Sequence, residues 1–253
     1  MKIRAVLFDA FGTLFDVHSV ALLAEQLFPG CGDRLSMLWR DKQIEYTRLV
    51  SMSGAQGAAG STHGSPQGGP HGGPHGSPHG SPHYRPFWDI TRAALRHTAL
   101  RLNLTLTAAA EERLMNQYRH LSAFAENHEV LSELKRRSVI TGILSNGDPE
   151  MLKVAVKSAG FVDLLQHVLS VHPVRRFKTD PAAYAVGTSA LGLPAREVLF
   201  VSSNAWDAIG ATWFGYTTLW INRTGAPPEQ LGTEPTYTGR SLRDVLNHFA
   251  APT

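Results

Sequence analysis

The sequence predicts an α/β protein in which helices cover a parallel sheet and a helical cap is inserted after the first strand. Short apolar runs bounded by Gly, Pro, Asn or Asp alternate with amphipathic segments along most of the chain. Four helical patterns interrupt this alternation after the first run. With 253 residues, of which 43% are hydrophobic, the chain is long enough for a core domain with a smaller insert.

Five apolar runs are the predicted strands: residues 3–8, 139–145, 167–171, 197–202 and 217–222. Near-continuous apolar runs are typical of strands that are buried on both faces of a parallel sheet. Amphipathic helices are predicted between them at residues 149–159, 181–191 and 205–213. We therefore expect a Rossmann-like core formed by residues 1–15 and 128–253.

The cap is predicted from apolar residues spaced three and four apart in residues 17–27, 34–50, 87–102 and 108–124. We expect residues 16–127 to form this cap over the edge of the sheet. A segment at about residues 53–83, almost entirely Gly, Ser, Pro, His and Ala, interrupts it. Its tetrads place proline at every fourth residue, which excludes helix and central strand, so the segment is predicted to be a disordered surface loop.

The histidines of these tetrads, His71, His75, His79 and His83, could bind a soft divalent metal. An expanded repeat that is tolerated in a loop is the interpretation that we favour, because long surface insertions cost little loop-closure entropy.

Overall composition excludes several classes of function. The formal charge is only +3 and no block of Lys and Arg occurs, so we expect no nucleic-acid partner. The first apolar run stops at Asp9 and no apolar stretch reaches membrane-spanning length, so we expect no targeting segment and no membrane partner. Cys31 is the only cysteine, which excludes an internal disulfide and fits a cytoplasmic protein.

Polar side chains follow three of the predicted strands. Each cluster alone could be a turn or a helix cap. Ligands of open α/β sheets, however, bind outside the carboxyl ends of the strands, so the coincidence at three strand ends predicts one shared site. The clusters are Asp9 with Thr13, Ser145 with Asn146, and residues 202–207, which include Ser202, Asn204 and Asp207.

Five segments of the chain resemble the motifs of a known family. "FDAFGTLFD", "LSNGDPEM", "RFKTDPAAY" and "FVSSNAWDAIGA" resemble the motifs of the haloacid dehalogenase superfamily, and "LWRDKQIEY" is similar to the arginine-bearing helix of its L-2-haloacid dehalogenases (type II). The resemblance covers the chain except the Gly/Pro/His segment. It implies an (S)-2-haloacid dehalogenase that converts short-chain 2-haloalkanoic acids to (R)-2-hydroxy acids and halide, with no metal or other cofactor.

Phe11 separates this function from that of the superfamily's phosphatases. Those enzymes resemble one another in carrying a second Asp two residues after the nucleophile, which protonates the leaving group, and acids after the fourth strand that hold Mg²⁺. Here Phe11 takes the first position, and Asp207 is the only acid among residues 202–207. Mg²⁺ prefers carboxylate and phosphate oxygens, so a single acid in residues 202–207 is a poor basis for a Mg²⁺ site. A halide leaves without a proton, so Phe11 in place of the acid does not hinder dehalogenation. Both observations favour a dehalogenase over a phosphatase.

The resemblance also implies roles for single residues. Asp9 would be the nucleophile that forms a covalent ester, with Lys178 keeping it ionised and Thr13 supporting it. Residues that would bind the substrate carboxylate are Ser145 and the backbone N–H groups around Ala10 and Phe11. Arg40 and Asn146 would contact the departing halide. The other implied site residues are Ile44, Phe87 and Trp206 in an apolar wall, Tyr184 in the polar network, and Ser202, Asn204 and Asp207 around the hydrolytic water.

Ile44, Phe87 and Trp206 are equally plausible as ordinary core residues, and Asp16 is expected to cap the first cap helix. A homodimer through the cap helices is implied by the resemblance. Two alternatives remain: a phosphatase-like hydrolase of the same superfamily, and a non-enzymatic metal-binding or interaction protein that uses the His-rich segment. Chelator-insensitive halide release, and activity that survives deletion of residues 60–83, would distinguish the dehalogenase from both.

Overall fold

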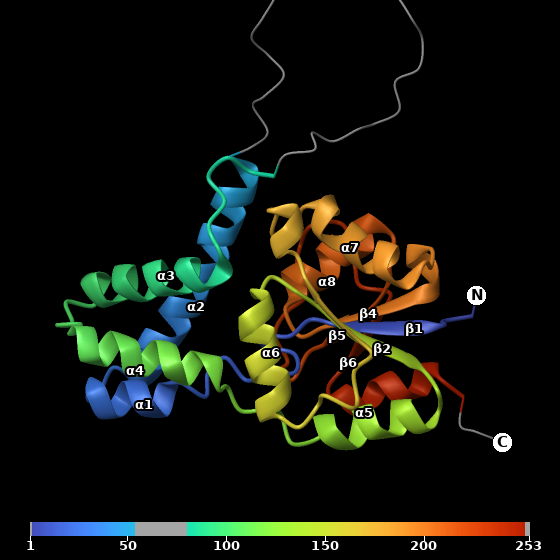
Figure 1. The fold of residues 1–253 in the computed structure, drawn as a ribbon, viewed down its shortest axis with the longest axis horizontal. Helices are drawn as coiled ribbons and strands as arrows, with labels where there is room; N and C mark the ends of the chain where they lie inside the picture. The colour runs from blue at the N-terminus through green and yellow to red at the C-terminus, as the bar shows by residue number, and fades with distance from the viewer. Residues whose placement is uncertain (1, 54–79, 251–253) are drawn as a thin grey trace, which may run out of the picture.

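The computed structural model describes residues 2–53 and 80–250, which form a parallel sheet with helices on both faces and a group of helices at one side (Figure 1). Six strands lie in the order β3-β2-β1-β4-β5-β6, and every neighbouring pair is parallel. The predicted α/β class is confirmed. The strands are β1 (Ala5–Phe8), β2 (Ile140–Ser145), β3 (His167–Ser170), β4 (Val198–Ser202), β5 (Thr217–Ile221) and β6 (Tyr237–Gly239).

Strand β1 lies in the middle of the sheet and is completely buried. It pairs with β2 on one side and β4 on the other, so that Phe8 is in register with Ile143 and with Val201. Because the three strands are parallel and in close register, the residues that follow them meet at one edge of the sheet. The three polar clusters of the sequence therefore converge here.

The core helices cover the sheet from two sides. In Figure 1, α7 (Pro181–Leu191) and α8 (Ala205–Phe214) lie on one side, and α5 (Asn127–Arg136) and the 3-10 helix η3 (Leu242–His248) lie on the other. The remaining elements of the core are α6 (Pro149–Ser158), η1 (His172–Val174) and η2 (Ala195–Glu197). The sequence analysis missed α5, and it missed β6 because this three-residue strand has no apolar run.

Four helices, which we call the cap helices, lie beside the sheet and pack on one another: α1 (Ala21–Leu27), α2 (Gly32–Met52), α3 (Phe87–Arg101) and α4 (Ala108–Arg119). All four were predicted. Helix α4 ends five residues before its predicted end because the following segment runs beside the chain that leaves β1. Here the Asp16 N–H donates to the carbonyl of Ser122 over 2.8 Å.

The predicted role of Asp16 is wrong. Its carboxylate accepts the backbone N–H of His18 over 2.9 Å and so closes a turn at residues 17–20. Helix α1 begins only at Ala21, and no side chain caps it. A short polar side chain two residues before a free N–H forms such a turn in preference to a helix.

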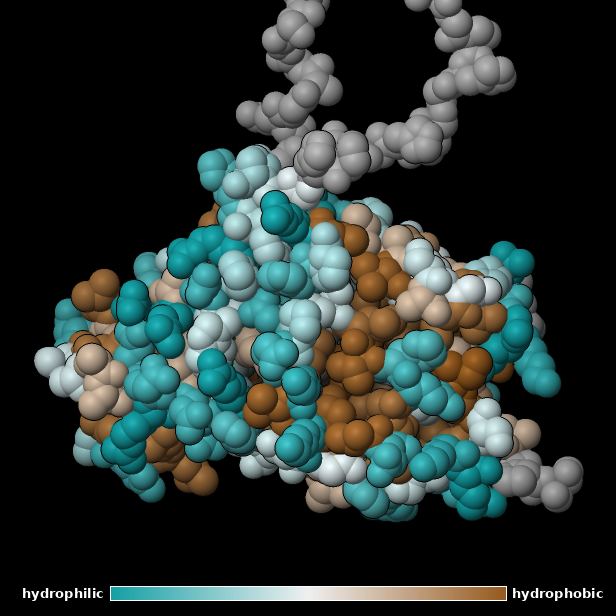
Figure 2. Space-filling view, in the orientation of Figure 1, coloured by the Kyte–Doolittle hydropathy of each residue, from teal (hydrophilic) through white to brown (hydrophobic). Residues whose placement is uncertain are grey.

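An aromatic contact joins the core to the cap helices. The ring of Phe11, which follows β1, stacks on Phe87 of α3 and on Tyr118 of α4 with centroid distances of 5.6 and 5.8 Å. Such pairs add about 0.5–1.5 kcal/mol each to the burial of their surface. Figure 2 shows that polar residues cover much of the cap on the visible face, whereas hydrophobic residues form a band across the core. Within residues 2–53 and 80–250, no helix is both long enough and apolar enough to cross a bilayer.

Residues 54–79, which hold all of the Gly/Pro/His tetrads but the last and include His71, His75 and His79, lie outside the described residues. The described residues on either side of them, which the sequence analysis included in the predicted disordered loop, make hydrogen bonds. The Ser53 and Ser81 hydroxyls are 2.7 Å apart, and the Ser81 N–H donates to the carbonyl of Arg175 over 3.2 Å. Both flanks are thereby held against the core loop that leads to Lys178.

Replacing residues 54–79 with a four-residue Gly/Ser linker should leave the fold intact. The flanking residues are already held together, and shortening a closed loop lowers its entropic cost by about 0.6 kcal/mol per halving of length. We expect the midpoint of thermal unfolding to stay the same or to rise by a few degrees. The control replaces residues 54–83, which also removes Ser81, and should unfold at a lower temperature. Equal midpoints for the two variants would show that the Ser81 contacts contribute nothing.

Candidate active site

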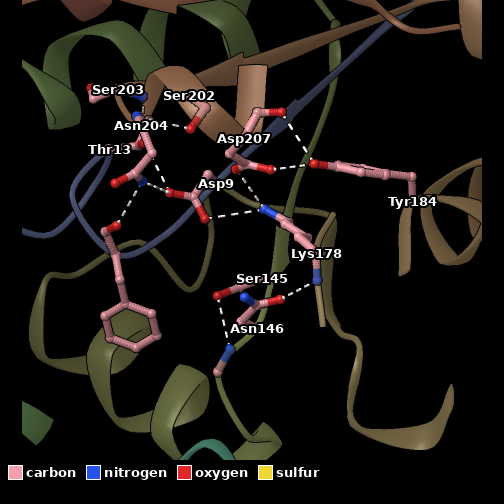
Figure 3. A network of polar contacts seen from close by, with 12 residues as sticks. Asp9, Thr13, Ser145, Asn146, Lys178, Tyr184, Ser202, Ser203, Asn204 and Asp207 are labelled. Atoms are coloured by element: carbon pink, nitrogen blue, oxygen red, sulfur yellow. Dashed lines mark hydrogen bonds and ion pairs between the residues drawn. The ribbon is translucent and has the colours of Figure 1, made fainter. Parts of the chain in front are cut away.

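Asp9 follows β1, and its carboxylate is nearly buried, with 6% of the residue exposed. One oxygen, Oδ1, accepts a hydrogen bond from Lys178 Nζ over 3.1 Å. The other, Oδ2, accepts from the Thr13 hydroxyl over 3.1 Å and from Asn204 Nδ2 over 2.8 Å (Figure 3). Hydrogen bonds to a carboxylate are among the stronger ones in proteins, so both oxygens have a fixed position.

Lys178 places one positive charge between two carboxylates. Its side chain is completely buried, and Nζ lies 3.1 Å from Asp9 Oδ1 and 3.0 Å from Asp207 Oδ2. Its backbone N–H donates to Asn146 Oδ1 over 2.9 Å, and the preceding N–H, of Phe177, donates to the Ser51 hydroxyl of α2 over 2.8 Å. Core and cap therefore both position the loop that carries this lysine.

Asp207 lies in the first turn of α8, where the helix dipole favours an anion. Burial raises the pKa of its carboxyl to about 6; the Lys178 charge acts against this rise, and the nearby Asp9 charge adds to it. The Tyr184 hydroxyl donates to Asp207 Oδ1 over 2.8 Å. Burial and the neighbouring Asp207 charge hold the pKa of Tyr184 well above its usual value, so the phenol stays protonated and remains a donor.

Arg40 enters the site from cap helix α2. Its Nη2 donates to the carbonyl of Phe11 over 2.9 Å and to Asn204 Oδ1 over 3.3 Å. Its Nη1 donates to Gln43 Oε1 on the same helix over 2.7 Å. The guanidinium therefore joins the cap to the two core loops beside Asp9.

A small cavity lies where these residues meet. It holds about 10 Å³ of free space, close to the room that one water needs, so a larger ligand enters only if side chains move. Its lining combines polar and charged side chains with apolar ones. The lining residues are Asp9, Phe11, Arg40, Ile44, Thr47, Phe87, Ser145, Asn146 and Trp206.

Comparison with known proteins identifies the family to which this chain belongs. A model of the haloacid dehalogenase-like hydrolases matches residues 3–215. The chain is 41% identical over 247 residues to an (S)-2-haloacid dehalogenase from Pseudomonas sp. (strain YL), which covers 98% of this chain and 94% of that protein. The chain belongs to the (S)-2-haloacid dehalogenase family. The family resemblance found in the sequence motifs is confirmed.

Solved structures of L-2-haloacid dehalogenases share the fold of this family member. The crystal structure of the L-2-haloacid dehalogenase RSc1362 is 53% identical to this chain in sequence, with a TM-score of 0.86 and coverage of 98% of both chains. The enzyme from Xanthobacter autotrophicus with chloropropionic acid covalently bound is 32% identical, with a TM-score of 0.80 and coverage of 97% of both chains.

In this dehalogenase family member, nearly all predicted site residues are brought together. They line the cavity, or they contact Asp9 or Asp207 directly. The two exceptions are Ala10, which is buried and does not line the cavity, and Ser202, whose hydroxyl accepts the Asn204 N–H over 3.1 Å instead of reaching Asp9. Ser145 lines the cavity while its hydroxyl accepts the N–H of Gly147 over 3.1 Å.

Several residues that shape the site were missed. The sequence could have indicated Gln43, because it lies three residues after Arg40 and so shares its face of a helix. The other missed residues come from distant parts of the sequence, and no sequence pattern connects them with the site. They are Ser51, Thr91 and Tyr118 of the cap helices, and Arg223, which donates to the Thr13 carbonyl and to the Ser203 hydroxyl.

The kcat/KM for halide release should fall as the pH falls through about 6, because Asp207 of the free enzyme then takes up a proton and loses the charge that pairs with Lys178. We expect kcat/KM to drop about tenfold per pH unit below this value in steady-state assays between pH 8 and 5.

Protonation of Asp207 does not itself destabilise the fold. The pKa of Asp207 is higher in the folded chain than the ordinary 3.8, so the folded state binds more protons between about pH 4 and 6, and this group adds stability as the pH falls. Circular dichroism at each pH checks the fold. A kcat/KM that stays constant from pH 7 to 5 would show that the charge of Asp207 in the free enzyme is not needed.

Proposed function

We propose that the protein hydrolyses the carbon–halogen bond of short-chain (S)-2-haloacids through an ester of Asp9, without metal or other cofactor. The observation that carries this proposal is the setting of Asp9. Its carboxylate is held by Lys178, Thr13 and Asn204 and borders a cavity that combines the Arg40 guanidinium with an apolar wall. The covalently bound chloropropionic acid of the Xanthobacter autotrophicus relative supports an ester in this chain too.

In the first step, a carboxylate oxygen of Asp9 attacks C2 of the substrate from the side opposite the halogen. The new C–O bond forms as the C–halogen bond breaks, so the halide leaves with the electron pair and C2 inverts. Arg40 and Asn146 donate to the departing halide. The Ser145 hydroxyl and the N–H groups around Ala10 and Phe11 bind the substrate carboxylate, and the apolar wall formed by Ile44, Phe87 and Trp206 excludes water.

In the second step, water attacks the ester carbonyl of Asp9 and releases the (R)-2-hydroxy acid. Esterification removes the negative charge of Asp9, so the Lys178 ammonium, 3.0 Å from Asp207, then faces one carboxylate instead of two. Loss of the Asp9 charge lowers the pKa of Asp207, which this charge had helped to raise. Asp207 is thereby ionised when a base is needed to take a proton from the water, with Asn204 and Ser202 shaping the loop around it.

A phosphatase of the same superfamily is the weaker alternative. The space between Asp9 and Asp207 is taken by the Lys178 ammonium, which would repel Mg²⁺ at that point. Phe11 stacks on two aromatic rings and offers no proton to a leaving group. A metal-binding or interaction role of the His-rich segment involves residues outside those described. It predicts that removal of residues 54–79 abolishes function, whereas the dehalogenase should keep its activity.

Halide release from 2-chloropropionate in the presence of a chelator tests the reaction, its metal requirement and its stereochemistry together. We expect release from the (S)-enantiomer and at least about a hundredfold less from the (R)-enantiomer, because only one places the halogen opposite the attacking oxygen. Asp9→Asn should abolish release, since the amide is not a nucleophile. Metal-dependent release of phosphate from phosphate esters, or substantial activity of Asp9→Asn, would contradict the proposal.

We also propose that residues 1–15 and 128–253 form the core domain and that residues 16–127 form the cap. We propose further that the enzyme works in the cytoplasm.

We propose that the enzyme is a homodimer through the cap helices. Leu22, Met37 and Leu49 support the dimer, because these apolar cap residues are 78%, 54% and 55% exposed. Sedimentation at micromolar concentration should give twice the chain mass of 27.6 kDa, and Leu22→Glu should lower it. A monomer at all concentrations would contradict the dimer.

A further inference from the structure

A buried polar network lies inside the cap, directly behind Arg40. Gln43 of α2, Thr91 of α3 and Tyr118 of α4 are between 0% and 3% exposed, although each carries a polar group. Buried polar groups cost free energy unless they are hydrogen-bonded, and a helix bundle gains more from apolar residues at such positions. The three residues therefore need an explanation beyond cap stability.

The hydrogen bonds of the network fix the orientation of the Gln43 amide. The Thr91 hydroxyl donates its only proton to the carbonyl of Phe87 over 2.8 Å, so toward Gln43 it can only accept. The amide nitrogen of Gln43 takes that contact. The amide oxygen must then face the other way, where it accepts from Arg40 Nη1 over 2.7 Å and from the Tyr118 hydroxyl over 3.1 Å.

Tyr118 strengthens the same arrangement. Burial raises the pKa of its phenol, so the hydroxyl stays protonated and serves as a donor to Gln43. Its ring is held by stacking on Phe11 and by a tilted contact with Trp39 at 5.2 Å. The hydroxyl thus has a fixed position from which it occupies the second lone pair of the Gln43 oxygen.

The guanidinium of Arg40 is consequently held from two sides. The cap oxygen of Gln43 binds Nη1, while the core oxygens of Phe11 and Asn204 bind Nη2. Three of its five N–H groups are used by described residues, so two are left for other acceptors, and Arg40 lines the cavity.

We propose that Gln43, with Thr91 and Tyr118 behind it, is a positioning residue that holds the Arg40 guanidinium toward the departing halide. This inference rests on the proposed function, in which Arg40 donates to that halide. Chloride is a poorer leaving group than bromide, so its departure depends more on donors. Loss of the positioning contact should slow the chloride reaction more than the bromide reaction, whereas a purely structural defect should slow both alike.

The experiment measures halide release in a single turnover, with enzyme in excess over (S)-2-chloropropionate or (S)-2-bromopropionate, so that only the displacement step is observed. Gln43→Met keeps the length of the side chain and removes the amide acceptor. Because a hydrogen bond to a charged group is stronger than one between neutral groups, we expect the chloride rate to fall roughly tenfold or more. The bromide rate should fall less, so the bromide-to-chloride ratio should rise at least about threefold.

Thr91→Val and Thr98→Val form a matched pair in case the Gln43 variant does not fold. Both threonines lie buried on α3, but the Thr98 hydroxyl has no hydrogen-bond partner among the described residues. Thr91→Val frees the Gln43 amide to turn and should raise the ratio, whereas Thr98→Val should leave it at the wild-type value.

The outcomes separate the two proposals. If the wild-type enzyme releases no halide, the proposed function fails. If it does release halide but Gln43→Met and Thr91→Val keep the wild-type ratio, or if Thr98→Val shifts it equally, the positioning role is overturned.

Discussion

The site depends on one ammonium group that is shared by two buried carboxylates. Asp9 and Asp207 come from different strand ends, and Lys178 lies between them at 3.1 and 3.0 Å. Removing Lys178 would leave two buried carboxylates without a counter-charge, and breaking a buried ion pair in this way costs about 3–5 kcal/mol. Three parts of the fold place these charges together: the parallel strands β1 and β4, the first turn of α8, which carries Asp207, and the loop before α7, which carries Lys178. The three charges partly neutralise one another.

The cap contributes to this arrangement instead of only covering it. Ser51 of α2 accepts the N–H next to Lys178, and Arg40 of the same helix binds the loops after β1 and β4. A movement of α2 would therefore shift two charged groups of the site at once. The same helix also supplies Arg40, Ile44 and Thr47 to the lining of the small cavity, so its position sets the space beside Asp9.

The sheet and the position of the site could be predicted because both follow from local patterns. Buried parallel strands appear as apolar runs, and their carboxyl ends meet by geometry, which brought Asp9, Ser145 and Asp207 together. Arg40 and Lys178 could be chosen only through family resemblance, since nothing local separates them from surface residues. The Gln43 network and the true role of Asp16 escaped prediction because their partners are set by tertiary packing and by turn geometry.

Phe11 has a consequence for how this fold can change its chemistry. In the sequence, Phe11 stands where related phosphatases carry the acid that protonates the leaving group, and in the structure its ring joins the core to Phe87 and Tyr118 of the cap. A change to an acid at this position would put a carboxylate against the rings of Phe87 and Tyr118 and would remove the aromatic contact between core and cap. A change of Phe11 alone would thus weaken the packing between the core and the cap helices α3 and α4, besides altering the chemistry at the strand end.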